Sequence, residues 1–276
     1  MSSPSRPLDG TVAFITGAAR GQGRSHAVTL AERGADIIAV DICHDIPSVG
    51  YPLATAEDLA ETVRDVESLG RRIIAEQADV RDRGGMQKII DRGVAELGPV
   101  RTIVANAGVA PLMGGLDDDT TMADVLAVNL VGAWNTVKVA VPSMIDAGRG
   151  GSVVLISSTQ GLAGTGGDGT AGLTGYTMSK HGLVGLMRSF ANWLAPHSIR
   201  VNSVHPTGVP TPMIMNDQMQ AHLQSFAATG DRQSNLLPVP MVESIDISRA
   251  VAWLASDDAR YITGVALPVD AGFAAK

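Results

Sequence analysis

Two side chains that could exchange a proton together stand four positions apart in this sequence. Tyr176 and Lys180 lie in a stretch with helical spacing, so both project from the same face of a helix. A free phenol has a pKa near ~10 and is therefore a poor base at neutral pH. A neighbouring ammonium favours the phenolate and lowers that pKa toward the range useful for proton transfer with an alcohol. The same spacing also occurs in surface pairs on helices, so the interpretation depends on what surrounds the pair.

A glycine-rich turn near the N-terminus has the composition of a phosphate-binding site. Gly17, Gly21 and Gly23 stand between an apolar run and a helical pattern, in the spacing G-x-x-x-G-x-G. Glycine allows a tight turn and a close approach of the backbone to a pyrophosphate, and the next helix presents free N–H groups and its positive dipole end. The alternative is a purely structural turn. Arg20 and Gln22 share this segment, and we expect both to contact the same ligand.

A carboxylate at the end of the second apolar run indicates that this ligand is a dinucleotide. Asp41 follows Gly21 by about twenty residues, where a carboxylate can bind both ribose hydroxyls of adenosine. It would also repel a 2′-phosphate, which favours NAD over NADP. Arg20 argues for the opposite preference, because a guanidinium in the turn could bind a 2′-phosphate. Since Arg20 can instead pair with Asp41 or with a pyrophosphate oxygen, we predict NAD. The alternative for Asp41 is a solvated residue at a strand end.

Short β-branched runs alternate with longer amphipathic segments, which predicts an α/β fold. Runs that are apolar on both faces are typical of a parallel sheet covered by helices on each side. We therefore expect one Rossmann-like, doubly wound domain over residues 11–276, with seven strands, about six helices and a flexible tail at 1–10. The expected strands are Thr11–Thr16, Asp36–Val40, Arg72–Gln77, Thr102–Ala105, Gly151–Ser157, Arg200–Val204 and Val265–Val269.

Three segments look like additions to this framework. Cys43–Thr55 contains Pro and Gly and delays the helix after the second strand. Gly161–Gly175 is rich in glycine and is predicted to be a mobile loop. Pro206–Ser244 is long and carries many Met, Leu and Phe residues, so we interpret it as a lid over a binding site. Parallel sheets bind ligands beyond the carboxyl ends of their strands, where these segments would lie.

Composition narrows the cellular context. Of 276 residues, 45% are hydrophobic and 18% charged, with a formal net charge of −7. This acidic balance argues against binding to nucleic acid or to anionic membranes. Cys43 is the single cysteine, so the chain can form no internal disulfide and has no thiol pair for a metal site. The first ten residues lack the apolar core of a signal peptide, and contiguous apolar runs are too short to cross a bilayer. We expect a cytoplasmic enzyme without a metal.

Further polar residues follow the later strands, and the order of all these motifs carries a family resemblance. The sequence resembles short-chain dehydrogenases/reductases from about Gly10 to Phe273, and the joint occurrence of the motifs is highly specific. The motifs are Thr16–Gly23, Asp79-Val80, Asn106-Ala107-Gly108, Asn129, Ser157-Ser158, and Tyr176 with Lys180.

The resemblance implies a role for each matching residue. Tyr176 exchanges the proton, and Lys180 holds the nicotinamide ribose and depresses the pKa of the tyrosine. Ser158 lies three residues before Gly161, the spacing of the serine that orients the substrate oxygen. Asn129 would hold a water that links Lys180 to solvent. Read from the residues alone, the alternative for Asn129 is a satisfied amide in the core.

The resemblance also implies a set of residues that bind the cofactor. Thr207 replaces the usual glycine after Pro206, so the backbone there could differ from the family pattern. Val209 and Thr211 stay in place to meet the carboxamide side of nicotinamide, and we interpret the adjacent His205 as structural. The full set is Gly17, Arg20, Gly21, Gln22, Gly23, Asp41, Ile42, Asp79, Val80, Asn106, Ala107, Gly108, Ser157, Tyr176, Lys180, Pro206, Thr207, Val209 and Thr211.

A narrower resemblance concerns the actinobacterial carveol dehydrogenase-like and mycofactocin-coupled subgroup. It rests on Ala18–His26, on Val40–Cys43 with the inserted segment up to Thr55, and on the ending Val269–Phe273. The resemblance implies a tightly held NAD, a redox-carrier partner such as mycofactocin, and a homotetramer. We hypothesise that the insert slows cofactor release by folding over the adenosine end.

The lid suggests the class of substrate. Its apolar side chains would favour a hydrophobic secondary alcohol or ketone, such as a cyclic terpenoid, although they could simply pack the lid onto the body or onto a partner subunit. Two other functions remain open: an epimerase or dehydratase acting on a sugar nucleotide, and a catalytically idle NAD-binding regulator. The apolar lid residues are Met213, Ile214, Met215, Met219, Leu223, Phe226, Leu236 and Leu237.

Overall fold

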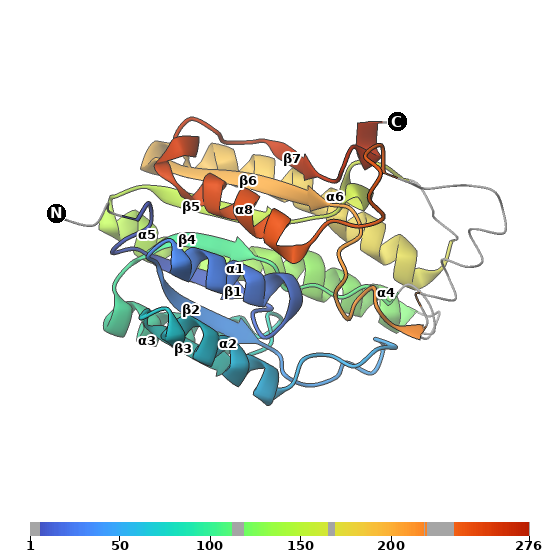
Figure 1. The fold of residues 1–276 in the computed structure, drawn as a ribbon, viewed down its shortest axis with the longest axis horizontal. Coiled ribbons are helices and arrows are strands. Elements are labelled where there is room, and N and C mark those ends of the chain that lie inside the picture. Colours follow the sequence, from blue (N-terminus) through green and yellow to red (C-terminus); the bar gives the residue numbers. More distant parts are fainter. Residues whose placement is uncertain (1–5, 112–118, 165–168, 218, 220–234, 276) are drawn as a thin grey trace.

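A parallel sheet organises the part of the chain that the computed structural model describes, residues 6–111, 119–164, 169–217, 219 and 235–275. Within it, seven strands lie in the order β3-β2-β1-β4-β5-β6-β7, and every neighbouring pair is parallel (Figure 1). The strands are β1 (Val12–Thr16), β2 (Asp36–Asp41), β3 (Ile73–Gln77), β4 (Val100–Ala105), β5 (Gly151–Ile156), β6 (Ile199–Pro206) and β7 (Ala266–Val269).

Helices cover both faces of this sheet because its strands are apolar on both faces. In β1, Val12 and Phe14 face one core cluster, while Ala13 and Ile15 face the other. Helices α3, α5 and α6 pack on the first face, and α1, α2 and α8 pack on the second (Figure 1). Their bounds are α1 (Gly21–Glu32), α2 (Ala56–Ser68), α3 (Arg83–Leu97), α4 (Asp119–Leu126), α5 (Gly132–Ala147), α6 (Ala171–Leu194) and α8 (Ser244–Ala255).

The predicted Rossmann-like fold is confirmed. All seven expected strands are present, each with ends within one or two residues of the expected positions. The strand order reverses between β1 and β4, since β2 and β3 lie to one side of β1 and β4–β7 to the other. Such a switch point opens a crevice beyond the carboxyl ends of the strands, where ligands bind in open α/β sheets.

One helical run differs from what the apolar stretches suggested. Helix α4, the π-helix η1 (Ala127–Val131) and α5 are continuous over Asp119–Ala147, and an 18-residue window within this run has a mean hydropathy of 1.3. This run is long and apolar enough to cross a membrane by length and composition. Within the protein, 61% of its apolar window is buried, because α4 packs on α6 and α5 packs on β4 and α3. Polar residues recur along this run, so no contiguous apolar stretch in the sequence is as long as the helix.

The chain before β1 packs against the body from residue 6 onward. Leu8 is buried, and its N–H donates to the carbonyl of Arg33 at 2.9 Å. Thr11 donates its hydroxyl to the carbonyl of Leu8 at 2.7 Å. These contacts differ from the flexible tail expected over residues 1–10, of which 1–5 lie outside the described residues. Parts of two other predicted segments also lie outside the described residues. They are residues 218 and 220–234 of the lid expected at 206–244, which include Leu223 and Phe226, and residues 165–168 of the glycine-rich loop.

A buried carboxylate fastens the end of the sheet opposite the crevice. Asp36 is 4% exposed and lies 2.7 Å from a guanidinium nitrogen of Arg71 and 2.8 Å from one of Arg72. It also accepts the backbone N–H of Arg72 at 3.0 Å. Burial alone raises the pKa of Asp36, but the Arg72 hydrogen bonds and both guanidinium charges outweigh it, so the pKa falls below its ordinary value of 3.8.

We therefore predict that Asp36→Asn lowers the free energy of unfolding by about 3 kcal/mol, as expected when one partner of a buried ion pair is removed. Because the folded pKa is depressed, the stabilisation is complete above the unfolded value and is lost as the pH falls through the folded one. Urea unfolding of both proteins across acidic pH measures this difference. Arg92→Ala, which breaks an exposed pair with Glu76 and Glu96, should change stability little. Equal effects of the two substitutions would contradict the assignment.

Candidate active site

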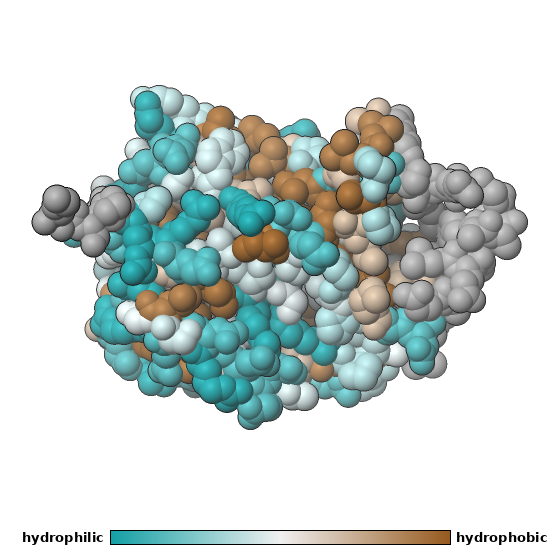
Figure 2. Space-filling model, viewed as in Figure 1, coloured by the Kyte–Doolittle hydropathy of each residue, from teal (hydrophilic) through white to brown (hydrophobic). Residues whose placement is uncertain are grey.

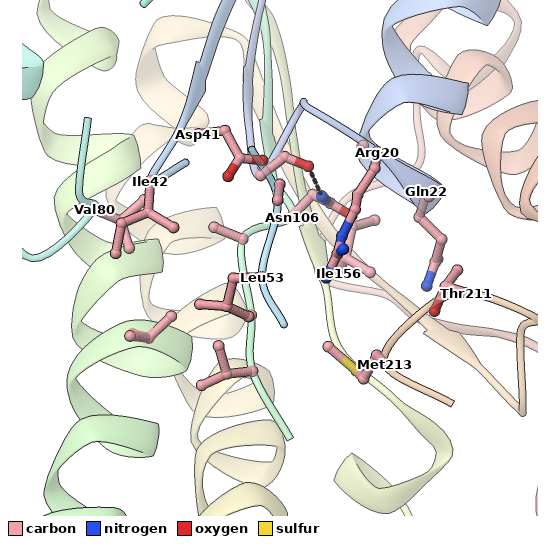
Figure 3. A pocket seen from close by; sticks show the side chains of 18 of the residues that line it. Arg20, Gln22, Asp41, Ile42, Leu53, Val80, Asn106, Ile156, Thr211 and Met213 are labelled. Carbon is pink, nitrogen blue, oxygen red and sulfur yellow. Dashed lines mark hydrogen bonds between the residues drawn. The ribbon is translucent and has the colours of Figure 1, made fainter. Parts of the chain in front are cut away.

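A cleft at the switch point encloses about 1030 Å³, its open mouth included. Figure 3 shows Asp41, Arg20 and Gln22 around it, with Thr211 beside Gln22 and Met213 below them. Most of the predicted cofactor-binding residues line this cleft, although they come from the ends of strands β1 to β5, from helix α6 and from the segment after β6. They are Gly17, Arg20, Gly21, Gln22, Gly23, Asp41, Ile42, Asp79, Val80, Asn106, Ala107, Gly108, Ser157, Tyr176, Lys180 and Thr211.

The glycine turn leaves no room for side chains. Gly17 and Gly21 have φ values of +67° and +55°, in the left-handed region that favours glycine. A Cβ on Gly17 would lie 2.8 Å from the Cα of Ala107, and one on Gly23 would overlap the carbonyl oxygen of Gly17. Asn106 fastens the turn to β4, since its side-chain amide donates to the carbonyls of Thr16 and Gly17 at 3.0 and 3.1 Å. The turn is therefore a rigid, open backbone surface.

The start of α1 has the features that a pyrophosphate requires. Its N-cap residue, Arg20, makes no side-chain capping bond, so the first backbone N–H groups of the helix remain available. Gln22 points toward the neighbouring Thr211 (Figure 3), and its buried Oε1 has no hydrogen-bond partner in the part of the chain described. A donor on a bound ligand would satisfy that oxygen. These observations fit a dinucleotide.

Asp41 at the end of β2 faces the same cleft. Its carboxylate accepts the backbone N–H of Ala19 at 2.9 Å and that of Cys43 at 3.4 Å. The side chain thus braces the glycine turn from the next strand. Burial raises the pKa of Asp41, and the N–H donors and the charge of Arg20 offset only part of this effect. Arg20 itself donates to the carbonyl of Pro52 at 2.6 Å, a contact that sequence analysis did not foresee.

The insert Cys43–Thr55 forms one wall of the cleft through Ile46, Leu53 and Ala54. Figure 1 shows it as the blue segment that leaves β2 and runs toward α4. Ser48 donates to the carboxylate of Asp124 on α4 at 2.6 Å. The hydroxyl of Tyr51, which is buried, accepts the N–H of Ala110 at 3.1 Å. The insert is therefore packed against the body. Its position directly after Asp41 was the feature of the sequence that pointed to the cleft.

A charged cluster supports the far end of the cleft. Asp79 and Arg81 form an ion pair at 2.7 Å, and Arg81 reaches Asp124 at 2.9 Å. Burial alone raises the pKa of Asp79, but the hydrogen bonds and charge of Arg81 outweigh it and lower the pKa overall. Because Asp124 also accepts from Ser48, this cluster links the loop after β3, the insert and helix α4.

Tyr176 and Lys180 meet at the end of β5. The Lys180 ammonium is buried, lies 5.5 Å from the centre of the Tyr176 ring and donates to the carbonyl of Ile156 at 2.9 Å. The Ser157 hydroxyl donates to the carbonyl of Lys180 at 3.0 Å, so α6 is fixed to the strand from both sides. Ser158 hydrogen-bonds the Tyr176 hydroxyl. Four of the predicted residues therefore converge in space.

Burial dominates the electrostatics of this pair. It raises the pKa of Tyr176 above its ordinary value, and the hydrogen bond with Ser158 offsets only part of the rise. It also lowers the pKa of Lys180 to about 8. The expectation that the tyrosine pKa is lowered is thus wrong for the protein by itself, because removing the phenol from water dominates its pKa. At neutral pH the pair is a neutral phenol beside an ammonium.

Asn129 lies in η1, where one π-helical turn interrupts the helix. Its amide accepts the N–H of Val109 at 2.8 Å and donates to the carbonyl of Val109 at 2.9 Å. It also donates to the Ser179 hydroxyl at 3.2 Å, and Ser179 donates to the carbonyl of Tyr176 at 2.7 Å. The side chain is a satisfied core amide that joins the β4 loop to α6. The role of holding a water for Lys180 remains a prediction.

Three predicted cofactor residues and two catalytic ones, Asn129 and Ser158, lie outside the lining of the cleft. Pro206 ends β6, Thr207 donates to Asn235 at 3.0 Å, and Val209 is buried in the core beside α8. Ser158 lies just behind the lining, against Tyr176. Sequence analysis predicted Met213 as part of the apolar lid but missed several other lining residues, most of them apolar and without a recognisable motif: Ile46, Leu53, Ala54, Ala78, Val109, Val128, Ile156 and Pro212.

Comparisons with known proteins agree with this geometry. A model of the short chain dehydrogenase family matches residues 11–222. An uncharacterised oxidoreductase of Mycobacterium tuberculosis is 56% identical, and the match covers 98% of each chain. The (−)-trans-carveol dehydrogenase of Rhodococcus erythropolis is 49% identical over 96% of this chain and 98% of that protein.

A solved structure is similar over the same extent. The crystal structure of carveol dehydrogenase from Mycobacterium avium in complex with NAD has a TM-score of 0.90 and 49% identity. The match covers 98% of this chain and 99% of that one. These findings confirm the resemblance of the sequence to carveol dehydrogenase-like proteins. The chain therefore belongs to the short-chain dehydrogenase family and is an oxidoreductase.

Proposed function

We propose that this NAD-dependent oxidoreductase interconverts a hydrophobic secondary alcohol and its ketone, with Tyr176 as the acid and base. The observation that carries the proposal is the convergence of Tyr176, Lys180 and Ser158 at one end of a cleft whose other end is the glycine turn. A group that exchanges protons thus lies beside a site shaped for a dinucleotide. When bound, NAD supplies the nicotinamide that accepts or returns a hydride.

The residues of the chain move and stabilise the proton. A neutral Tyr176 hydroxyl donates to the oxygen of a ketone, and the phenolate that forms is stabilised by the nearby Lys180 charge. In the oxidative direction, the same group takes the proton of the alcohol. Ser158, already hydrogen-bonded to Tyr176, orients the substrate oxygen. The anchoring of Lys180 on Ile156 holds its charge in place throughout.

The apolar surroundings favour a hydrophobic substrate. Met213, Val109 and Val128 line the cleft. Leu236 and Leu237 are 59% and 60% exposed, and Figure 2 shows apolar side chains gathered over the end of the molecule that carries the C-terminus. The backbone N–H groups of Leu236 and Leu237 donate to the carbonyl of Ala271. A cyclic terpenoid alcohol, as in the relatives named for carveol, fits such a wall better than a charged acid or a sugar.

Retention of NAD between turnovers follows from the way the insert is fastened. Its contacts reach Arg20 in the glycine turn, Asp124 on α4 and Ala110 after β4, so it can release a ligand only by breaking several bonds. A retained cofactor must be reoxidised in place, which agrees with a redox carrier such as mycofactocin as partner.

We extend the proposal to a single catalytic domain, a cytoplasmic location and a homotetramer. Val131, Trp134, Met178 and Trp193 on η1, α5 and α6 are exposed and suit such an interface.

Replacing Tyr176 by Phe tests the proton-transfer role. The variant keeps the ring and removes the exchangeable proton, so we expect kcat to fall by at least ~100-fold, a typical contribution of general acid–base catalysis. NAD binding, followed by nicotinamide fluorescence or calorimetry, should remain close to that of the wild type. Turnover near the wild-type rate on a panel of cyclic alcohols would rule out the mechanism.

Two substitutions at Asp41 separate its charge from its hydrogen bond to Ala19. Asp41→Asn keeps an acceptor for that N–H and removes the charge, so it should gain NADP binding relative to NAD. Asp41→Ala should weaken NAD binding further, because the glycine turn loses its brace. Dissociation constants for both dinucleotides give the answer, and an unchanged preference in both variants would refute the ribose role.

Loosening the insert should speed the exchange of NAD. Ser48→Ala with Tyr51→Phe removes two of the anchoring hydrogen bonds, each worth about 1 kcal/mol, so the double variant should release NAD roughly 30-fold faster. Displacement of bound NAD by a fluorescent analogue measures the rate. Ser68→Ala, which removes an exposed hydroxyl at the end of α2, serves as control. A wild-type protein that purifies without dinucleotide and exchanges it rapidly would contradict retention.

A further inference from the structure

One buried imidazole beside the active site takes no part in the steps described above. His205 lies near the end of β6 and is 0% exposed. Its Nδ1 lies 2.8 Å from the carbonyl oxygen of Ser158, and its Nε2 lies 2.8 Å from the hydroxyl of Ser203. The ring therefore bridges its own strand and Ser158, which lies two residues after the end of the neighbouring strand β5.

Chemistry fixes the tautomer of this ring. A carbonyl oxygen can only accept, so Nδ1 carries the hydrogen that it donates to Ser158. Burial lowers the pKa of His205, which keeps the ring neutral at physiological pH. The other nitrogen, Nε2, is then an acceptor and takes the hydroxyl hydrogen of Ser203. Both ring nitrogens are satisfied, and the orientation of the ring is determined.

The imidazole continues the sheet by one residue. Backbone pairing of β5 with β6 ends where the N–H of Ser157 donates to the carbonyl of Val204 at 2.8 Å. The carbonyl of Ser158, the next residue, accepts from the side chain of His205 at 2.8 Å and from the backbone N–H of Gly161 at 2.9 Å. Without His205 this carbonyl would keep only the bond from Gly161, within its own loop, and would lose its hydrogen bond to strand β6.

The side chain of Ser158 is held from the opposite direction. Its hydroxyl oxygen accepts the N–H of Gln160 at 3.1 Å, at the start of the short helix η2 (Thr159–Gly161). The hydroxyl also hydrogen-bonds Tyr176. The backbone of Ser158 thus rests on His205 and its Oγ on Gln160, which leaves this serine little freedom at the point where it would meet a substrate oxygen.

We propose that His205 is a positioning residue that fixes Ser158 for catalysis, by supplying the donor that strand β6 cannot supply from its backbone. The inference rests on the proposed function, since it acts through Ser158. It replaces the purely structural role that sequence analysis gave to this histidine. A displaced reacting group can cost about 100-fold in rate, so the contribution is measurable.

Asparagine and glutamine at position 205 provide a matched pair. The amide nitrogen of asparagine stands in the position of Nδ1 and can keep the bond to Ser158, whereas that of glutamine stands in the position of Nε2 and cannot. We expect kcat to fall about 10–100-fold in His205→Gln and in His205→Leu. His205→Asn should retain most of the activity. The dissociation constant for NAD, measured by fluorescence, should change little in all three.

His26→Leu is the control for the loss of a buried imidazole. His26 is also 0% exposed and contacts a serine hydroxyl, that of Ser248, at 2.8 Å, but it lies between α1 and α8. Its replacement should lower thermal stability and leave kcat unchanged. If His205→Leu does not fold, the asparagine and glutamine variants decide. Equal kcat values in that pair, or wild-type kcat in a folded leucine variant, would overturn the inference.

Ser158→Ala separates this inference from the proposed function. If Ser158→Ala keeps wild-type turnover, the proposed role of the serine fails and the inference fails with it. If Ser158→Ala is impaired while His205→Gln is not, only the inference fails. If both single variants are impaired, adding His205→Gln to Ser158→Ala should lower kcat little further, because the two residues act as one unit. Full additivity of the two losses would show that His205 acts elsewhere.

Discussion

The burial of the Lys180 ammonium is the constraint on which the active site depends. A charge removed from water needs a partner, and here the partner is the carbonyl of Ile156 at the end of β5. That contact, with the bond from the Ser157 hydroxyl to the carbonyl of Lys180, fixes α6 on the sheet. Gly161 is required at the same place, because a Cβ there would lie 2.6 Å from the carbonyl oxygen of Lys180. The position of Tyr176 follows from this anchoring.

The cofactor end of the cleft is built on a different principle, the close approach of backbone segments. The glycine turn, the end of β4 and the end of β2 touch through main-chain atoms, with the side chains of Asn106 and Asp41 as braces. Such a surface offers N–H groups and shape at little cost in reorganisation. The insert then adds side-chain contacts from outside. Rigidity in the turn and closure by the insert are therefore separate devices.

Single residues explain where prediction from the sequence succeeded and where it failed. Asp41 was found because its distance from the glycine turn is characteristic, and Lys180 because it stands one helical turn from Tyr176. The pKa of Tyr176 was predicted in the wrong direction, since its burial depends on neighbours far away in the chain. The anchoring of Arg20 on Pro52 and the engagement of His205 with Ser158 involve a backbone carbonyl, which has no signature in sequence.

The sequence by itself determined the fold class, the order of the motifs and the kind of chemistry they permit. Periodicity and glycine spacing report local backbone geometry, and local geometry is encoded locally. Tertiary structure alone decided which groups are buried, which carbonyls they bind and how far the insert covers the cleft. These properties depend on the water excluded when strands and helices assemble, and that exclusion sets the strength of every charge and hydrogen bond in the site.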